Sequence, residues 1–237
     1  MGIYQLLADY YDGLVKDDRS TLAWVDLIMR HARIQKVCEF ACGSGEITLA
    51  LAKRGASVVA SDLSEAMVQK AMAKDVDHLV EWKVCDMLAY QDERRYDCVL
   101  CLCDSLNYLI EDNQIQSFIQ NSYKLLKDEG TLIFDVHSLD RLNEFQDEFY
   151  EEGYLNGTSY EWSILSDGDL LYQTFVFFDE AANAHYEQHV QRVYDPLLLK
   201  QWCIDAGFSV EIVTDFVHPG ICEGEKYFYI CHKGGAA

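Results

Sequence analysis

The sequence predicts an α/β protein with a doubly wound, Rossmann-like sheet that is mostly parallel and flanked by helices. Apolar strand segments alternate with helical segments between residues 36 and 136. The strand segments are short and apolar at consecutive positions, which is typical of strands buried on both faces of a parallel sheet. After His137 apolar and polar residues alternate, which predicts an antiparallel β insertion before the last helix and strand pair.

The first half of the chain has a regular expected order. Strands are expected at 36–41, 57–61, 79–84, 96–103 and 131–136, and helices at 3–15, 20–32, 46–54, 64–74 and 111–127. Ser20 and Ser64 are the expected N-caps of their helices, because a serine hydroxyl can accept a hydrogen bond from the first helical turn.

The second half begins with a region of alternating residues at 154–194, of which 170–177 is one stretch. Turn residues at 166–169 and 182–184 separate the stretches, so antiparallel hairpins are expected. The elements expected after them are a helix at 196–206 and strands at 208–216 and 226–231.

This order predicts two structural units. A core is expected from residues 1–141 and 196–237, with two helices at its N-terminus, and residues 142–195 are expected to form an inserted antiparallel region. The chain of 237 residues is long enough for one large domain with such an insertion.

The charge of the chain restricts its partners. It has 40 acidic and 19 basic residues and a formal net charge of −21, which disfavours nucleic acid as a substrate because phosphates are bound through Lys and Arg. The acidity can equally serve solubility alone. No apolar run approaches the roughly 20 residues that span a bilayer, and the N-terminus lacks the regions of a secretory signal. We therefore expect a cytoplasmic protein without membrane association.

The nine cysteines do not form a recognisable disulfide framework. Cys98 and Cys101 form a C-x-x-C pattern, but they lie in an expected strand. Side chains three residues apart in a strand point to opposite faces, so these two thiols cannot bind one metal ion. We expect reduced, apolar cysteines and no metal site.

A glycine loop at 39–45 follows the first expected parallel strand and opens a helix. Ligands of doubly wound sheets bind at the carboxyl ends of strands, where glycine lets a ligand approach the backbone. Thr48 stands where a dinucleotide fingerprint needs its third glycine. The acidic Glu39 suits a cationic ligand better than a pyrophosphate. S-adenosylmethionine carries an ammonium and a sulfonium group and no phosphate, so it fits this loop.

Two acidic residues follow the next strands. Asp62 ends the second strand and can accept hydrogen bonds from both ribose hydroxyls. Asp86 ends the third strand and can accept from the adenine amino group, while Met87 offers an apolar face to the ring. The alternative interpretation is that Asp62 caps the helix after Ser64 and that Asp86 stabilises a turn.

Together these residues resemble the class I S-adenosylmethionine-dependent methyltransferases. The resemblance covers about residues 8–136 and the strands from 208 onward, and five motifs carry it in order: 39–45, 62–67, 85–87, 96–101 with 104–108, and 125–134. Ala41 replaces the usual glycine of the first motif, and Glu39 replaces a frequent Asp. The resemblance implies S-adenosylmethionine as the cofactor and methyl transfer as the activity.

The resemblance also implies the residues that bind the cofactor. They are Tyr11, Glu39, Ala41, Gly43, Gly45, Asp62, Leu63, Met67, Cys85, Asp86, Met87, Leu102, Cys103 and Asp104. The segment 7–12 and Trp24 resemble the lid helices of a bacterial subgroup of unassigned members. Tyr11 is therefore expected to cover the cofactor, or alternatively to pack the lid onto the core.

His137 ends the fifth expected strand at the edge of the sheet where the cofactor is expected. It is the candidate general base for an acceptor that carries a proton, although it can also hydrogen-bond locally. The acceptor is expected to be a small neutral or cationic molecule, because the insertion is rich in aromatic and acidic residues. Candidate substrate residues are Asn107, Tyr108, Tyr172 and Arg192.

Alternatives remain open. Arg192 can bind a substrate carboxylate or pair with an acid of the protein, and the aromatic residues of the insertion can be its own core. An NAD-dependent dehydrogenase is a second enzyme class, against which Thr48 argues. A non-catalytic module that binds the cofactor or a partner is the third interpretation.

Overall fold

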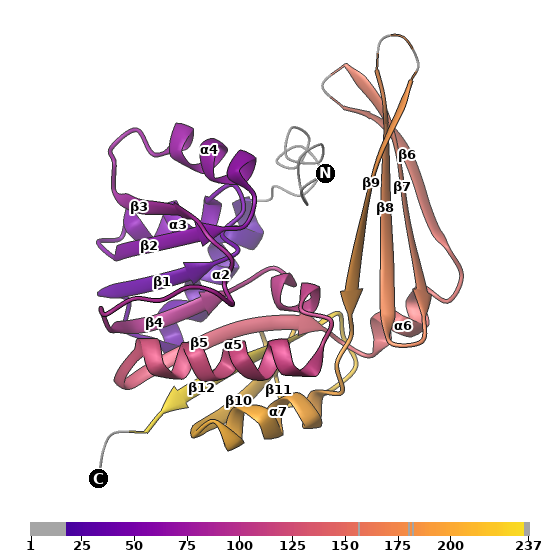
Figure 1. The fold of residues 1–237 in the computed structure, drawn as a ribbon. Helices are drawn as coiled ribbons and strands as arrows, with labels where there is room; N and C mark the ends of the chain where they lie inside the picture. Colours follow the sequence, from indigo (N-terminus) through magenta and orange to yellow (C-terminus); the bar gives the residue numbers. More distant parts are fainter. Residues whose placement is uncertain (1–17, 156, 180, 182, 235–237) are drawn as a thin grey trace.

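The computed structural model describes residues 18–155, 157–179, 181 and 183–234, and their main feature is a twisted sheet with helices on both faces (Figure 1). The sheet has eight strands in the order β11-β10-β12-β5-β4-β1-β2-β3. Its strands are β1 (Lys36–Phe40), β2 (Ser57–Asp62), β3 (Val80–Val84), β4 (Tyr96–Cys101), β5 (Leu126–His137), β10 (Phe208–Thr214), β11 (His218–Pro219) and β12 (Lys226–Lys233). β1 to β5 are parallel, and β12 and β10 are antiparallel to their neighbours. The predicted doubly wound α/β fold is confirmed.

The helices cover the two faces separately. They are α2 (Asp18–His31), α3 (Glu46–Ala52), α4 (Glu65–Lys74), the 3-10 helix η1 (Ser105–Tyr108), α5 (Asp112–Leu125), α6 (Asp140–Glu144) and α7 (Pro196–Asp205). Ile115 of α5 and Leu199 of α7 belong to one hydrophobic core, whereas Leu27 of α2 and Leu51 of α3 belong to the other. Such burial of two helix layers against one sheet supplies most of the driving force for this fold.

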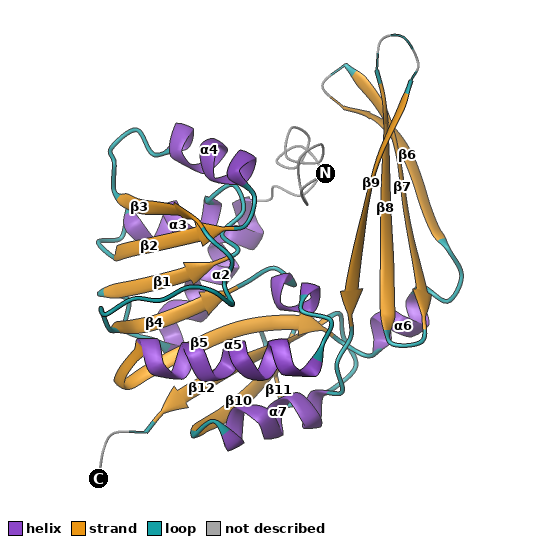
Figure 2. Cartoon of the chain, in the orientation of Figure 1, coloured by secondary structure: helices purple, strands orange, loops and turns teal. Residues whose placement is uncertain are grey.

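The insertion is a second, separate sheet that stands beside the first (Figure 2). Its antiparallel strands, in the order of the sequence, are β6 (Phe149–Leu155), β7 (Thr158–Asp167), β8 (Leu170–Phe178) and β9 (Ala184–Arg192). Gly168, with φ of 62°, makes the tight turn between β7 and β8. The predicted antiparallel insertion before the last helix and strands is confirmed.

Several expected boundaries differ from the structure. β4 ends at Cys101 and not at Cys103, because Cys103 and Asp104 adopt positive φ angles of 59° that leave the strand conformation. β5 begins five residues earlier than expected, and β3 is only half-buried because it lies at the edge of the sheet. Ser20 is not an N-cap, since the described helix already includes Asp18.

Other local expectations are confirmed. Ser64 is the N-cap of α4 and accepts a hydrogen bond of 3.3 Å from the Met67 amide. Cys98 and Cys101 pack into opposite cores, as their spacing in a strand requires. The expected helix at 3–15, and with it Tyr11, lies outside the described residues. Where the chain is described, no helix is long and apolar enough to cross a bilayer.

Asp75 links α4 to β3 and fixes the ring that lies under the glycine loop. Its carboxylate accepts hydrogen bonds from the amides of Leu79 and Val80, at 2.9 and 3.1 Å, and from the Trp82 indole at 3.0 Å. Asp75 is buried, with 3% of its surface exposed. Three donors therefore depend on one carboxylate that has little contact with water.

Replacing Asp75 with alanine is expected to lower the free energy of unfolding by about 3 kcal/mol, because it leaves three N–H groups without their acceptor. Urea denaturation followed by circular dichroism measures this change. The matched control is Asp77→Ala, at an exposed position two residues away. Equal stability of the two variants would contradict this role of Asp75.

Candidate cofactor and acceptor site

The glycine loop after β1 has a backbone that few residue types can adopt. Ala41, Gly43 and Gly45 have φ angles of 51°, 55° and 82°. A Cβ atom at Gly45 would lie 2.6 Å from the Trp82 ring and 3.0 Å from the Ala71 side chain. Gly45 is therefore required by close packing as well as by its φ angle.

Asp62 joins this loop to the end of β2. Its two carboxylate oxygens accept hydrogen bonds of 2.8 Å from the amides of Gly43 and Ser64. Burial raises the pKa of Asp62, although its backbone donors oppose the shift. An ionised carboxylate has about four acceptor positions, so these two contacts leave room for ligand hydroxyls. The structure thus shows Asp62 stabilising two loops, and a contact with ribose remains a proposal.

The neighbouring candidates lie in different environments. Asp86 is exposed and accepts a hydrogen bond of 2.8 Å from the Leu88 amide, which closes a local turn. Cys85 and Met87 pack at the edge of the core. Of the pair near α4, Leu63 is 59% exposed, whereas Met67 is buried and can offer only structural support unless it moves.

A cavity of about 700 Å³ opens beside the glycine loop. Its lining residues come from the core and from the insertion: Ser20, Thr21, Trp24, Glu39, Ala41, Cys42, Gly43, Ser44, Gly45, Glu46, Ile47, Leu102, Cys103, Asp104, Ser105, Tyr108, His137, Arg141, Phe145, Trp162, Ile164, Leu171, Gln173, Phe175, Gln191, Asp215, Phe216, Glu225, Lys226 and Phe228. This volume is ample for a small ligand. The cavity therefore connects the expected cofactor loop with the inner face of the insertion.

A charged cluster lies at the carboxyl ends of β4 and β5. Lys226 Nζ lies 2.5 Å from Asp104 Oδ2 and 3.4 Å from Asp135 Oδ2. The Asp104 amide also donates to Asp135 Oδ2 at 3.0 Å. Lys226 reaches this position because β12 pairs with β5 so that Lys226 lies opposite His137. Two carboxylates thus share one lysine.

The two carboxylates of the cluster have different proton affinities. Burial acts to raise the pKa of Asp104, but Lys226 and His137 outweigh it and hold that pKa at about 2. Burial raises the pKa of Asp135, which is fully buried, to about 7. Asp104 is therefore the permanent negative charge at this edge of the sheet.

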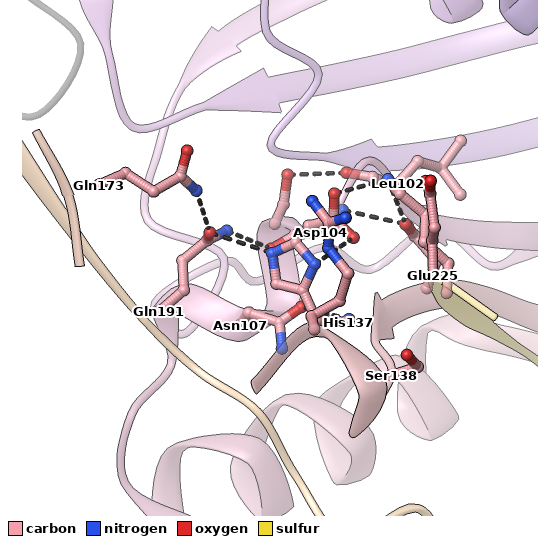
Figure 3. Close-up of polar contacts among 12 residues, drawn as sticks. Leu102, Asp104, Asn107, His137, Ser138, Gln173, Gln191 and Glu225 are labelled. Carbon is pink, nitrogen blue, oxygen red and sulfur yellow. Dashed lines mark hydrogen bonds and ion pairs between the residues drawn. The ribbon is translucent and has the colours of Figure 1, made fainter. Parts of the chain in front are cut away.

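His137 is held by the insertion through a chain of amides (Figure 3). Its Nε2 lies 3.1 Å from Gln191 Oε1, which also accepts a hydrogen bond of 2.6 Å from Gln173 Nε2. Its Nδ1 lies 3.5 Å from Asp104 Oδ1. Burial lowers the pKa of His137, although Asp104 acts in the opposite direction. The imidazole is therefore neutral at pH 7 and can accept a proton.

The structure separates the four candidate substrate residues. Tyr108 lines the cavity, and its hydroxyl lies 3.1 Å from His189 Nδ1. Asn107 lies outside the lining and joins two strand ends, because it accepts from the His137 amide and donates to the Arg192 carbonyl. Tyr172 is half-buried elsewhere on the insertion. Of the four, only Tyr108 is thus placed at the cavity.

Arg192 pairs with acids of the protein, which was the second of its two interpretations. Its guanidinium lies 2.7 Å from Asp169 and 2.6 Å from Asp112, away from the cavity lining. The interpretation of Arg192 as a ligand for a substrate carboxylate is not supported by this arrangement, because its charge is already balanced.

Sequence reasoning missed three residues of the site. Gln173 and Gln191 are polar residues at inward-facing positions of alternating strands, a signal that was available. No sequence pattern around Lys226 indicates a place in the site, because the pairing of β12 with β5 brings this residue to the cavity.

Comparisons with known proteins agree with this geometry. A family model described as a methyltransferase domain matches residues 37–130. A relative from Geobacillus sp. (strain WCH70), named "Putative methyltransferase", is 32% identical over 97% of this chain and 99% of its own length. The chain belongs to the class I S-adenosylmethionine-dependent methyltransferases.

Solved structures show the same fold for this methyltransferase. An S-adenosylmethionine-dependent methyltransferase from Clostridium acetobutylicum ATCC 824 matches with a TM-score of 0.84 and 22% identity, over 98% of this chain and 99% of its own. The sugar N-methyltransferase KedS8 from Streptoalloteichus sp. ATCC 53650 matches with a TM-score of 0.79 and 18% identity, over 99% and 95%. Both alignments include the insertion, so the second sheet is part of the shared fold.

Alanine at Gly45 is expected to reduce stability and cofactor affinity more than alanine at Gly43. Both positions have positive φ, which costs an alanine about 1–2 kcal/mol. Only at Gly45 does the new Cβ also overlap with Trp82, whereas nothing lies within 4 Å at Gly43. Thermal unfolding and calorimetric titration with S-adenosylmethionine compare the two variants. Equal effects would show that the contact with Trp82 does not constrain the loop.

Proposed function

We propose that this methyltransferase uses S-adenosylmethionine to methylate a small amine that binds in the cavity between the core and the insertion. The observation that carries the proposal is the continuity of the cavity from the glycine loop, at Gly43 and Gly45, to His137 and the inner face of the insertion. In such an arrangement a cofactor and an acceptor can lie next to each other, which is the main requirement of a displacement reaction.

The residues present fit the cofactor. Gly43 leaves open space for a ligand, since nothing lies within 4 Å of a Cβ placed there, and Asp62 at the end of β2 has acceptor positions that its two backbone contacts do not use. Glu39 is buried and accepts a hydrogen bond of 2.7 Å from Thr48. Leu102, Cys103 and the Asp104 backbone would face the amino-acid part. When bound, S-adenosylmethionine supplies a methyl group on a positively charged sulfur.

The charge of the cavity supports a neutral or cationic acceptor. Acidic lining residues outnumber basic ones: Glu39, Glu46, Asp104, Asp215 and Glu225 face the cavity together with Arg141 and Lys226. Lys226 is already paired with Asp104. A carboxylate acceptor would add negative charge to this site, whereas an ammonium group would be attracted to it. The strongly negative whole chain also disfavours nucleic acid as the acceptor.

The insertion, residues 142–195, would cover the acceptor. Trp162 and Phe175 stack with ring centroids 5.3 Å apart and form part of the cavity wall. The Trp162 indole N–H is buried without a hydrogen-bond partner among the described residues. It can therefore donate to an oxygen of the acceptor. This contact would increase the affinity for a molecule that carries a hydroxyl or carbonyl group near its amine. The name of the structural neighbour KedS8, a sugar N-methyltransferase, is compatible with such an acceptor.

Within this proposal His137 is the general base. In this role His137 would take the proton that the acceptor nitrogen must lose, which leaves the nitrogen lone pair available to the methyl group that bound S-adenosylmethionine would supply. Asp104 stabilises the imidazolium that results, since it lies 3.5 Å from Nδ1. A positioned base of this kind contributes about 10²–10⁴-fold to the rate.

Calorimetry is expected to show binding of S-adenosylmethionine and its demethylated product, and no binding of NAD.

Asp62→Ala is expected to weaken the affinity for S-adenosylmethionine about 10-fold or more, because the loop loses its hydrogen bond at the Gly43 amide and the ribose loses an acceptor. Asp77→Ala, at an exposed position, is the control. Unchanged affinity in Asp62→Ala would exclude this role for the carboxylate.

Isotope transfer from methyl-labelled S-adenosylmethionine tests the acceptor class. Matched pairs of an amine and its hydroxyl counterpart that carry no carboxylate, such as ethanolamine with ethylene glycol and glucosamine with glucose, are followed by mass spectrometry. Label is expected only in amines, because an ammonium group complements the acidic cavity. Label in the hydroxyl compounds alone would overturn the amine proposal and leave methyl transfer itself intact.

A further inference from the structure

We infer that Gln191, on strand β9 of the insertion, is a positioning residue that decides which nitrogen of His137 is free to take the acceptor's proton. The inference rests on the proposed function, because it assigns a task to His137 within methyl transfer. The insertion then contributes a residue that positions the general base, in addition to covering the acceptor.

The orientation of the Gln191 amide is determined by a backbone carbonyl and agrees with its contact to Gln173 (Figure 3). Its Nε2 donates a hydrogen bond of 3.1 Å to the backbone carbonyl of Asp104. Its Oε1 accepts a hydrogen bond of 2.6 Å from Gln173 Nε2. The reverse orientation would place the Gln191 carbonyl oxygen against the Asp104 carbonyl oxygen, and two acceptors cannot form a hydrogen bond.

This orientation fixes the tautomer of His137. Since Gln191 presents an oxygen to His137 Nε2 at 3.1 Å, the ring nitrogen must be the donor in that contact. In a neutral imidazole the other nitrogen, Nδ1, then carries a lone pair. Gln191 is buried, with 3% of its surface exposed, so water does not compete for this contact.

The lone pair on Nδ1 faces another acceptor. Asp104 Oδ1 lies 3.5 Å away, and neither atom has a hydrogen-bond partner in the described part of the chain. Two buried acceptors side by side are unfavourable unless a donor reaches them. An ammonium group has several N–H bonds and can donate to both atoms at once. The two atoms are therefore suited to bind a protonated amine, and His137 Nδ1 can accept its proton.

The charged groups around His137 favour its neutral form, which is the form that can accept a proton. Three charged groups face it from other elements: Asp104 follows β4, Lys226 begins β12 and Arg141 lies in α6. Burial lowers the pKa of His137, Lys226 and Arg141 add to that effect, and Asp104 opposes it. The ring is then neutral before the acceptor binds, and its protonated form is stabilised by Asp104.

Nitrogen-15 NMR of the histidine-labelled full chain tests the tautomer without any acceptor. His137→Gln identifies the signals. In the unmodified protein the proton is expected on Nε2. In Gln191→Leu the acceptor of that proton is gone, so the proton is expected to move to Nδ1, where Asp104 attracts it. The control is Gln188→Leu, on the same strand at an exposed position, which should leave the tautomer unchanged.

Two activity measurements follow with an amine that accepts label. Gln191→Leu is expected to lower kcat about 10²-fold or more, with the affinity for S-adenosylmethionine within about twofold of Gln188→Leu. In Gln191→Glu the new carboxylate still holds the proton on Nε2 but raises the pKa of His137. The acidic limb of the pH–rate profile should therefore move up by about one pH unit.

The inference is overturned if the proton lies on Nδ1 in the unmodified protein. It is equally overturned if Gln191→Leu keeps the tautomer, the rate and the pH profile of Gln188→Leu. A protein that binds no S-adenosylmethionine and labels no acceptor contradicts the proposed function instead, and the NMR result then still reports whether Gln191 sets the tautomer.

Discussion

The site of this methyltransferase depends on how closely the backbone at Gly45 approaches the ring of Trp82. A Cβ there would lie 2.6 Å from the ring, so this backbone position exists only for glycine. Asp75 holds the ring through the indole nitrogen, at 3.0 Å, and Asp62 holds the same loop through the Gly43 amide. Strand β3, the end of helix α4 and the glycine loop are thereby fixed relative to one another. The cavity opens beside the glycine loop.

The features that could be predicted from the sequence are those whose causes are local. The alternation of buried strands and helices gave the doubly wound sheet, because each βα unit is encoded by adjacent residues. Gly45 and Ser64 were identified for the same reason, since a glycine bend and a helix cap need only their own neighbours. The change to two-residue periodicity after His137 likewise identified the insertion.

The missed features are those that depend on pairing between distant segments. Lys226 enters the site because β12 runs antiparallel to β5, and the residue opposite His137 cannot be read from either segment alone. Gln191 reaches His137 from the end of strand β9 that lies next to the core. Arg192 differs from Gln191 by one position and hence by one strand face, which is enough to place it with Asp169 and Asp112 outside the cavity.

The charge balance of the cluster explains why a site of this kind favours a cation. Lys226 compensates one carboxylate, and the second must either take a proton or meet another positive group, since an unpaired buried charge is costly. Burial raises the pKa of Asp135, so protonation of this carboxyl and binding of a cation are alternative ways to balance its charge. An ammonium group that approaches Asp104 adds the missing positive charge and favours the ionised form of Asp135. The same electrostatics that hold Lys226 inside the fold therefore attract the acceptor that the cavity can use.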